Sequence, residues 1–184
     1  CKTGVGDVLI GAAATIAEYN GVEKAAHIRD KIVEMNHLNE TLYACGIACS
    51  AEGYKTPAGT YQVNILLANI CKHNVTRFPY EIARLAEDIA GGLIATAPSE
   101  KDLRNPEVGK YIQKYLKGVE SVPTEHRLRI FRLIENICMG LGAVGYRTES
   151  MHGAGSPQAQ RIMIERMVDI NFKKRLAKAL AGIE

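Results

Sequence analysis

The sequence predicts an all-α protein, an antiparallel helical bundle of five or six helices, two of them long. Apolar residues recur three or four positions apart through most of the 184 residues. The breaks between these segments carry helix signals: Asn20-Gly21 is a stop, and both Asn105-Pro106 and Ser156-Pro157 place proline after an N-cap residue. The sustained alternation of apolar and polar residues that predicts strands is not found.

The first half of the chain is expected to form four helices, over residues 8–19, 22–51, 61–73 and 79–95. The segment Gly53–Gly59, which contains a proline, is expected to be a loop. The second helix has one continuous apolar stripe, because the spacing between its members is always three or four: Ile28, Ile32, Met35, Leu38, Leu42, Cys45 and Cys49.

The second half begins with the stretch "TAPSEKDLRNP", residues 96–106, which is expected to be a linker. A helix to Lys117 follows, then a helix over 124–142 whose Leu128, Phe131, Ile134, Cys138 and Leu141 face inward. A final helix starts at Ser156-Pro157 and runs nearly to the end. With no internal repeat or low-complexity tract, the sequence predicts one domain.

The charge balance excludes several function classes. The net charge of +3, from 23 basic and 20 acidic residues, is too small and too dispersed to predict nucleic-acid binding. One basic cluster is interpreted as the solvated end of a helix: Lys173, Lys174, Arg175 and Lys178. No apolar run approaches the roughly 18 residues that a membrane span requires, and no signal peptide is recognisable, so we expect a cytoplasmic protein with no membrane partner.

The five cysteines are an odd number, which favours a reducing compartment over a disulfide framework. Cys45 and Cys49 would share a helical face, and Cys71 with His73 could complete four metal ligands. Both cysteines, however, occupy the apolar stripe, which favours packing in the core. His73 is interpreted as a helix C-terminal residue favoured by the helix dipole.

The sequence begins at Cys1 without an initiator methionine, so we expect it to be a fragment. Cys1 lies outside every apolar stripe, beside Lys2 and a flexible Gly4-Val5-Gly6. Such surroundings lower a thiol pKa or let backbone approach a cofactor. On these residues alone, a ligand role is the less favoured interpretation.

The segment "TESMHGAGSPQAQR" interrupts the helical pattern between residues 148 and 161. Small residues after Glu149 would let a flat ligand approach the backbone, and the helix start at Ser156-Pro157 would favour an anion. A carboxylate beside a covered, water-poor surface would have a raised pKa and serve as a general base. The spacing alone favours the alternative, an interhelical turn with a solvated glutamate.

Three blocks, "CKTGVGDVLIGAAA", "VTRFPYEIARLAEDIAGG" and "ESMHGAGSPQAQRIMI", are similar to the C-terminal region of the 4-hydroxyphenylacetate 3-hydroxylase family, in its branch of 4-hydroxybutyryl-CoA dehydratase/vinylacetyl-CoA isomerases. The resemblance covers essentially the whole chain. It implies that residues 1–184 are the C-terminal helical domain of a larger flavoenzyme with acyl-CoA dehydrogenase-like architecture. It also implies an acyl-CoA thioester substrate, FAD, a 4Fe–4S cluster, a homotetramer, and contact with the N-terminal part of the same enzyme.

The resemblance implies roles for particular residues. Cys1 matches one of the three cysteines that, with one histidine, hold the family's cluster; the other ligands would lie upstream of this chain. Glu149 matches the active-site glutamate, which makes it the candidate base. The residues that follow it are the candidate cofactor contacts: Ser150, His152, Gly153 and Ala154. Cys45 and Cys49 do not match cluster ligands.

The pair Gly91-Gly92 near a helix end is expected to approach the FAD of a neighbouring subunit, because each glycine costs about 1 kcal/mol relative to alanine in a helix. A plain C-cap with a close helix crossing is the alternative explanation.

The implied reactions are dehydration of 4-hydroxybutyryl-CoA to crotonyl-CoA and isomerisation of vinylacetyl-CoA to crotonyl-CoA. Two alternatives remain open. One is a flavin-dependent hydroxylase of the same family, of the 4-hydroxyphenylacetate 3-monooxygenase type, which would need no cluster. The other is a bundle that serves only tetramer assembly. A histidine and cysteine pair upstream of Cys1 would favour the dehydratase.

Overall fold

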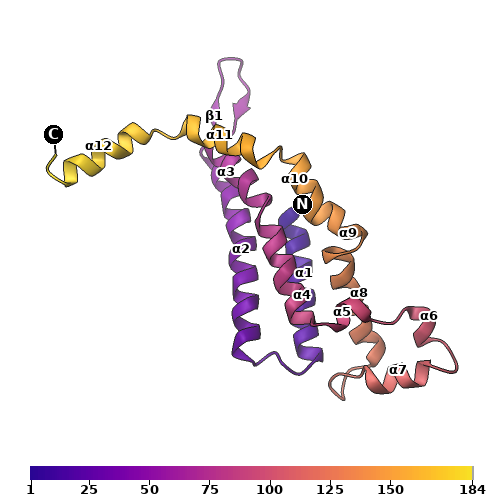
Figure 1. Ribbon diagram of the computed structural model, residues 1–184. Helices are drawn as coiled ribbons and strands as arrows, with labels where there is room; N and C mark the ends of the chain where they lie inside the picture. The colour runs from indigo at the N-terminus through magenta and orange to yellow at the C-terminus, as the bar shows by residue number, and fades with distance from the viewer. Residues whose placement is uncertain (184) are drawn as a thin grey trace.

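The computed structural model describes residues 1–183 and confirms the expected all-α bundle. Its main helices are α1 (Lys2–Tyr19), α2 (Ala26–Ala51), α3 (Ile65–Val75), α4 (Phe78–Ala90) and α8 (Thr124–Cys138). Figure 1 shows α1, α2, α4 and α8 side by side. Helices α1 and α4 each contact the other three, so the core lies around this pair.

The core is built around the small residues of α1. Ala13 and Ala17 are fully buried there, which allows the neighbouring helices to approach closely. Helix α4 contributes Ile82, and α8 contributes Phe131 and Ile134, all at most 1% exposed. The apolar spacing therefore predicted the buried faces of α4 and of α8 as far as Cys138. The prediction for Leu141 was wrong: α8 ends at Cys138, before the expected end at residue 142, and Leu141 lies in the next short helix with its side chain 86% exposed.

Helix α1 begins six residues earlier than expected. It starts at Lys2 rather than Val8 and runs through Gly4 and Gly6, so this segment is not the flexible stretch that its glycines suggested. Gly6 is buried against α2, where a Cβ would lie 2.1 Å from Asn39 Oδ1. The glycine is explained by this close approach of two helices rather than by flexibility.

A short hairpin replaces the expected start of the third helix. Strands β1 (Tyr54–Lys55) and β2 (Tyr61–Gln62) pair antiparallel at the end of α2, and Gly59 supplies the positive φ of +82° that the turn requires. Helix α3 begins only at Ile65, where the side chain of Asn64 accepts a hydrogen bond from Leu67 N at 3.0 Å.

Three short helices lie between α4 and α8: α5 (Leu93–Thr96), α6 (Glu100–Leu103) and α7 (Gly109–Tyr115). Helix α5 is the end of the expected 79–95 helix, which is interrupted at Gly91, and α7 is the expected helix before Lys117, so only α6 was missed within the expected linker. Helix α6 begins with a capping box, in which Ser99 and Asp102 bond each other's backbone N–H groups. Part of the polar composition of residues 96–106 is thus explained by this cap.

After α8 the chain continues through α9 (Leu141–Ala143), the π-helix η1 (Val144–Thr148) and α10 (Glu149–Gly153). The segment expected to be a loop is thus helical as far as Gly153. The expected final helix is divided into α11 (Pro157–Met167) and α12 (Ile170–Leu180), because Val168 is extended and Asp169 caps the second helix.

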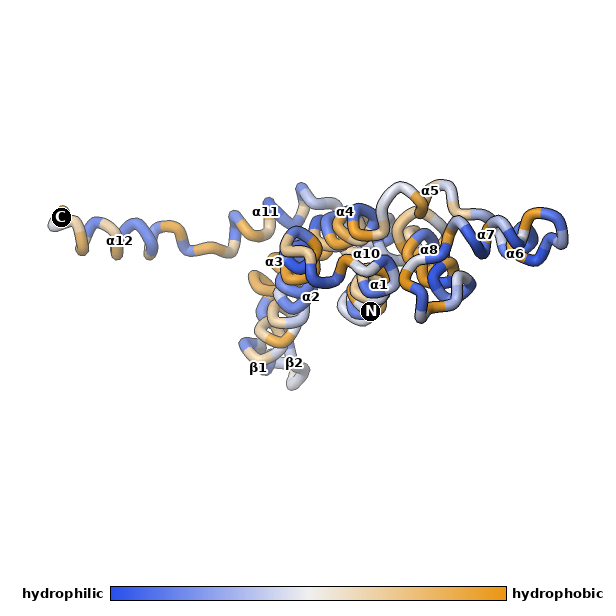
Figure 2. The backbone as a smooth tube through the Cα atoms, turned by 90° about the horizontal axis from the view of Figure 1, so that it is seen from below, coloured by the Kyte–Doolittle hydropathy of each residue, from blue (hydrophilic) through white to orange (hydrophobic). Residues whose placement is uncertain are grey.

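Helix α11 packs on α3, whereas every residue of α12 is exposed. Figure 2 shows α12 extending away from the bundle with apolar and polar residues interspersed along it. The basic cluster predicted to be solvated lies on this helix and is exposed. No helix formed by residues 1–183 is long and apolar enough to cross a membrane.

The cysteines of the α2 stripe differ from the prediction. The stripe is buried at Ile28, Met35, Leu38 and Leu42, but Cys45 and Cys49 are only partly buried, at the junction with α3. Burial raises the pKa of the Cys71 thiol, with Cys45 and Cys49 as further causes. These three thiols lie between α2 and α3 rather than in the closed core.

Candidate functional site

The candidate site lies where the first turn of α1 meets the start of α10. Lys2 Nζ, in the first turn of α1, donates hydrogen bonds to Glu149 Oε2 and to the backbone carbonyl of Gly145. The ammonium and the carboxylate are 147 positions apart in the sequence. The lysine side chain is 16% exposed and the glutamate side chain 53%, so the pair lies at the surface with its cation largely covered.

The hydrogen bond from Lys2 lowers the pKa of the Glu149 carboxyl, and the positive charge of Lys2 acts in the same direction. A raised pKa was expected only for a carboxylate beside a covered, water-poor surface. In this structure the carboxylate is half exposed and has a cation as its direct partner, as the alternative of a solvated glutamate implied. From the sequence, Lys2 was considered as a cation that could lower the pKa of the Cys1 thiol. In the structure its side chain instead binds Glu149.

Gly153 makes room for this carboxylate. It lies one helical turn after Glu149, and a Cβ at Gly153 would be 2.2 Å from Glu149 Oε1. A larger residue would push the carboxylate away from its present position. The glycine that the sequence marked as a possible cofactor contact therefore leaves the space that the Glu149 carboxylate occupies.

The π-helix that leads to Glu149 is anchored on two core helices. Arg147 donates to the carbonyl of Cys138, lies 3.5 Å from the Glu87 carboxylate and stacks on the ring of Tyr80. Tyr146 is buried, and burial raises the pKa of its hydroxyl. Wide helical turns of this kind are frequent at functional sites.

The residues after Glu149 separate into two groups. Ser150 is buried, and its hydroxyl donates to the Tyr146 carbonyl at 3.1 Å. His152 and Gly153 are exposed, and Ala154 is partly exposed. The surface beside the carboxylate is thus formed by the imidazole and the small residues, while the serine faces inward.

The turn that follows α10 is fixed from α11. Gln160 is 2% exposed and donates from Nε2 to the carbonyls of Ala154 and Gly155, at 2.7 and 3.0 Å. Gly155 has a φ of +84°, which suits glycine, and Ser156 Oγ accepts from Ala159 N to begin α11. Sequence reasoning identified this helix start but not the buried glutamine that holds the turn.

Cys1 is exposed at the first position before α1, next to the lysine that binds Glu149. The structure thereby brings the candidate ligand and the candidate base to one end of the bundle. Within residues 1–183, no three histidine, cysteine or acidic side chains are grouped so that they could hold a metal ion. A cluster bound at Cys1 would need its other ligands from outside this chain.

Gly91 and Gly92 lie elsewhere, at the junction of α4 with α5, away from α10 (Figure 1). Gly91 has a φ of +76° and donates from its backbone N to Glu87 O at 2.9 Å, so the C-cap accounts for it. Among residues 1–183, a Cβ at either glycine would meet nothing within 4 Å, so a close helix crossing does not account for this pair. Their predicted contact with a flavin in a neighbouring subunit stays a prediction.

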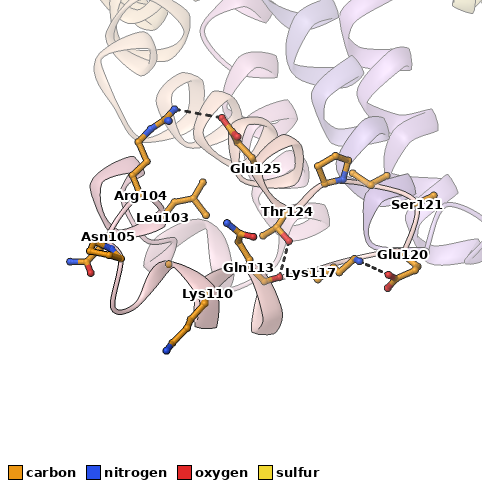
Figure 3. Close-up of a pocket in the computed structure, with 14 residues that line it drawn as sticks. Leu103, Arg104, Asn105, Lys110, Gln113, Lys117, Glu120, Ser121, Thr124 and Glu125 are labelled. Carbon is orange, nitrogen blue, oxygen red and sulfur yellow. Dashed lines mark hydrogen bonds and ion pairs between the residues drawn. The ribbon is translucent and has the colours of Figure 1, made fainter.

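A large cavity lies at the other end of α8. It has a volume of about 950 Å³ and is formed by α6, α7 and the start of α8. Figure 3 shows that its charged residues are partly paired, Arg104 with Glu125 and Lys117 with Glu120. None of the residues that the sequence marked as functional lines it.

Solved structures share the fold described above. The chain is 65% identical to an oxygen-tolerant archaeal 4-hydroxybutyryl-CoA dehydratase from N. maritimus, with a TM-score of 0.95. The matched region covers all of this chain and 37% of the other. The oxygenase component of a 4-hydroxyphenylacetate 3-monooxygenase, complexed with FAD and 4-hydroxyphenylacetate, has the same fold at 22% identity, with a TM-score of 0.86 over 98% of this chain and 38% of that one.

Curated sequences lead to the same group. The 4-hydroxybutyryl-CoA dehydratase/vinylacetyl-CoA-Δ-isomerase of Clostridium aminobutyricum is 63% identical over 100% of this chain, which spans 39% of its length. The oxygenase component of 4-hydroxyphenylacetate 3-monooxygenase from Thermus thermophilus is 27% identical over 77% of this chain and 29% of its own length. The family described as "4-hydroxyphenylacetate 3-hydroxylase C terminal" matches residues 1–182. The predicted resemblance is confirmed, and the chain belongs to this family.

Proposed function

We propose that this chain is the C-terminal helical domain of a cytoplasmic 4-hydroxybutyryl-CoA dehydratase/vinylacetyl-CoA isomerase. The whole enzyme would be a homotetramer that uses FAD and a 4Fe–4S cluster and forms crotonyl-CoA from either acyl-CoA substrate. The observation that carries the proposal is the contact of Lys2 with Glu149, since it joins the segment of the candidate cluster ligand to that of the candidate base. Identities of 63% and 65% to a dehydratase/isomerase and a dehydratase support the choice of reaction.

Glu149 would accept and return the protons that move on the carbon skeleton of the substrate. Lys2 holds the carboxylate ionised and fixed in direction, so it is available as an acceptor at neutral pH. A lowered pKa makes a weaker base, but a ligand that covers this half-exposed carboxylate would remove water from it and raise its pKa again. Substrate binding would thus adjust the base to its task.

The residues present fit the two groups that such an enzyme requires. Cys1 supplies one exposed thiol at the end of α1, consistent with a single ligand from this chain. Gly153 and Ala154 offer a surface of small residues beside the carboxylate, which suits a flat ring system. Bound FAD and the cluster would supply one-electron exchange and Lewis acidity toward the hydroxyl group that departs.

The two other functions receive less support. A hydroxylase of the same family shares the fold, but the identity to such a protein is only 27%. A purely structural bundle would not require a lysine, a carboxylate and a glycine arranged around one surface position. Gly91, Gly92, Ser150 and His152 stay proposed cofactor contacts.

The proposed base is tested with Glu149→Gln in the complete enzyme, assayed anaerobically for crotonyl-CoA formation from both substrates. We expect turnover to fall by about 10²- to 10⁴-fold with flavin and iron contents preserved, because the amide keeps the shape of the carboxylate but accepts no proton. Glu165→Gln is the matched control, since Glu165 is an exposed carboxylate on α11. Normal rates with normal cofactors would refute the assignment.

The proposed ligand is tested with Cys1→Ala by measuring iron and acid-labile sulfide per subunit. We expect both to fall, while Cys49→Ala, which changes a partly buried thiol of α2, leaves them unchanged. Unchanged iron in the Cys1 variant would remove Cys1 from the cluster and would favour the hydroxylase alternative.

A further inference from the structure

The first turn of α1 lacks the features that usually stabilise a helix start. Cys1 makes no side-chain capping bond, and the first turn contains no acidic residue. Gly4 and Gly6 follow at once, and glycine costs about 1 kcal/mol relative to alanine within a helix. A turn of this composition frays unless another part of the molecule holds it, yet it carries both Cys1 and Lys2.

Asn39, on α2, is the side chain that holds this turn. It is 2% exposed, and its Nδ2 donates to the Thr3 carbonyl at 3.2 Å and to Asp7 Oδ1 at 2.7 Å. Thr3 directly follows Lys2, and Asp7 lies one turn further along α1. The two hydrogen bonds therefore fix the first turn of α1 against the body of the bundle.

The orientation of this amide is fixed by its surroundings. Both partners of Nδ2 are acceptors, so the reversed amide would place its oxygen against two oxygens. Asn39 Oδ1 instead lies over the backbone of Gly6, and a Cβ there would be only 2.1 Å away. The asparagine and the glycine fit together, which explains a glycine inside a helix.

We propose that Asn39 is a positioning residue for the candidate site. It acts through α1: by holding the first turn, it keeps Lys2 within reach of Glu149 and keeps Cys1 at the same end of the bundle. This inference rests on the proposed function for its catalytic consequence. Its structural part, that Asn39 fastens the first turn, can be tested without any assay of activity.

The main test is Asn39→Asp in the complete enzyme, with Asn36→Asp as the matched control. The first change keeps the shape of the side chain but replaces the donor Nδ2 group by an acceptor oxygen that faces Thr3 O and Asp7. Asn36 lies on the same helix, is exposed and bonds only within its own helix, to Ile32 O. We expect kcat/KM to fall at least about tenfold for Asn39→Asp, mainly in kcat, and to stay unchanged for the control.

A double-mutant cycle with Lys2→Gln tests whether Asn39 acts through the lysine. If it does, the losses in the double variant Asn39→Asp/Lys2→Gln are less than additive, because the contact to be positioned is already lost in Lys2→Gln. Additive losses would overturn the inference. Adding Asp7→Asn to Asn39→Asp restores one donor–acceptor pair between positions 39 and 7, and we expect it to recover part of the lost rate.

Hydrogen exchange separates failure of this inference from failure of the proposed function. Amides of residues 5–7 should exchange faster in Asn39→Asp than in Asn36→Asp, whatever the enzyme catalyses. A wild-type enzyme without activity on either substrate would refute the proposed function only. Unchanged exchange in a folded Asn39→Asp protein would refute the role of Asn39. If that variant does not fold, Asn39→Ser, which keeps one donor, is measured in the same cycle and decides in the same way.

Discussion

Helices α4 and α12 have similar amphipathic sequences but opposite surroundings. The apolar face of α4 is buried, with Ile82 fully enclosed between α1, α2 and α8. The apolar residues of α12 are at least half exposed, and among residues 1–183 nothing covers them: Ile170, Phe172, Leu176 and Leu180. The difference shows that an apolar stripe predicts a helix with one face to be covered but does not identify what covers it.

The largest effect is expected from truncating the covered face. Ile82→Ala should lower the free energy of unfolding by about 2–5 kcal/mol, because it leaves a cavity in a close-packed core. Leu176→Ala on α12 should change it by less than about 0.5 kcal/mol in the isolated chain, since that side chain is already half exposed. Urea unfolding of both variants measures the contrast.

Equal losses of unfolding free energy in Ile82→Ala and Leu176→Ala would contradict the difference in burial between α4 and α12. A loss at Leu176 that depends on protein concentration would instead show that α12 is covered in an assembly, because stability then includes association.

A smaller contrast is expected between cysteines. Cys138 is 1% exposed and belongs to the same core cluster as Ile82, whereas Cys45 is partly buried outside it. We expect Cys138→Ala to cost about 1–2 kcal/mol and Cys45→Ala less than about 1 kcal/mol, because the lost volume is smaller than for leucine and a partly buried site can relax. Thermal unfolding of the two variants should reproduce that order, and the reverse order would place Cys45 in the core.

The thiols should also differ in reactivity. Burial raises the pKa of the Cys138 thiol to about 12, so it stays protonated and shielded near pH 8. We expect iodoacetamide to modify Cys1 in the native, metal-free chain at pH 8 and to modify Cys138 only after unfolding. Mass spectrometry of peptides from native and unfolded samples tests this, and rapid native labelling of Cys138 would be incompatible with its enclosure.

The smallest effect concerns the exposed pair of Lys2 and Glu149. Since the pKa of Glu149 is lowered below its usual value of 4.5 in the folded chain, the pair stabilises the fold above that value, and this contribution is lost as the pH falls below it. The stability difference between wild type and Lys2→Gln should therefore shrink from pH 6 to pH 3. Lys55→Gln, on the hairpin, serves as a control, and a difference that grows with acidification would contradict the pairing.

Periodicity predicted the helices whose faces are covered by other helices. The start of α8 at Thr124 and the buried face of α4 follow from residues three and four positions apart. The hairpin was missed, because two-residue strands are too short to show alternation. For the candidate site, the family resemblance identified Glu149, but neither Lys2 nor Asn39 could be connected to it. Lys2 and Glu149 are 147 positions apart, and Asn39 and Thr3 are 36 positions apart. A local sequence pattern does not report contacts at these separations.

The π-helix has a consequence for how this chain tolerates insertions and deletions. Relative to an α-helix, such a turn holds one extra residue, and each residue of an α-helix advances the direction of the side chains by about 100°. Removing one residue from Val144–Thr148 would restore regular helical winding and would swing Glu149 around the axis, away from Lys2. The length of this segment is therefore as strictly constrained as the identity of the glutamate, and a homologue one residue shorter here should lack the pair even with both residues retained.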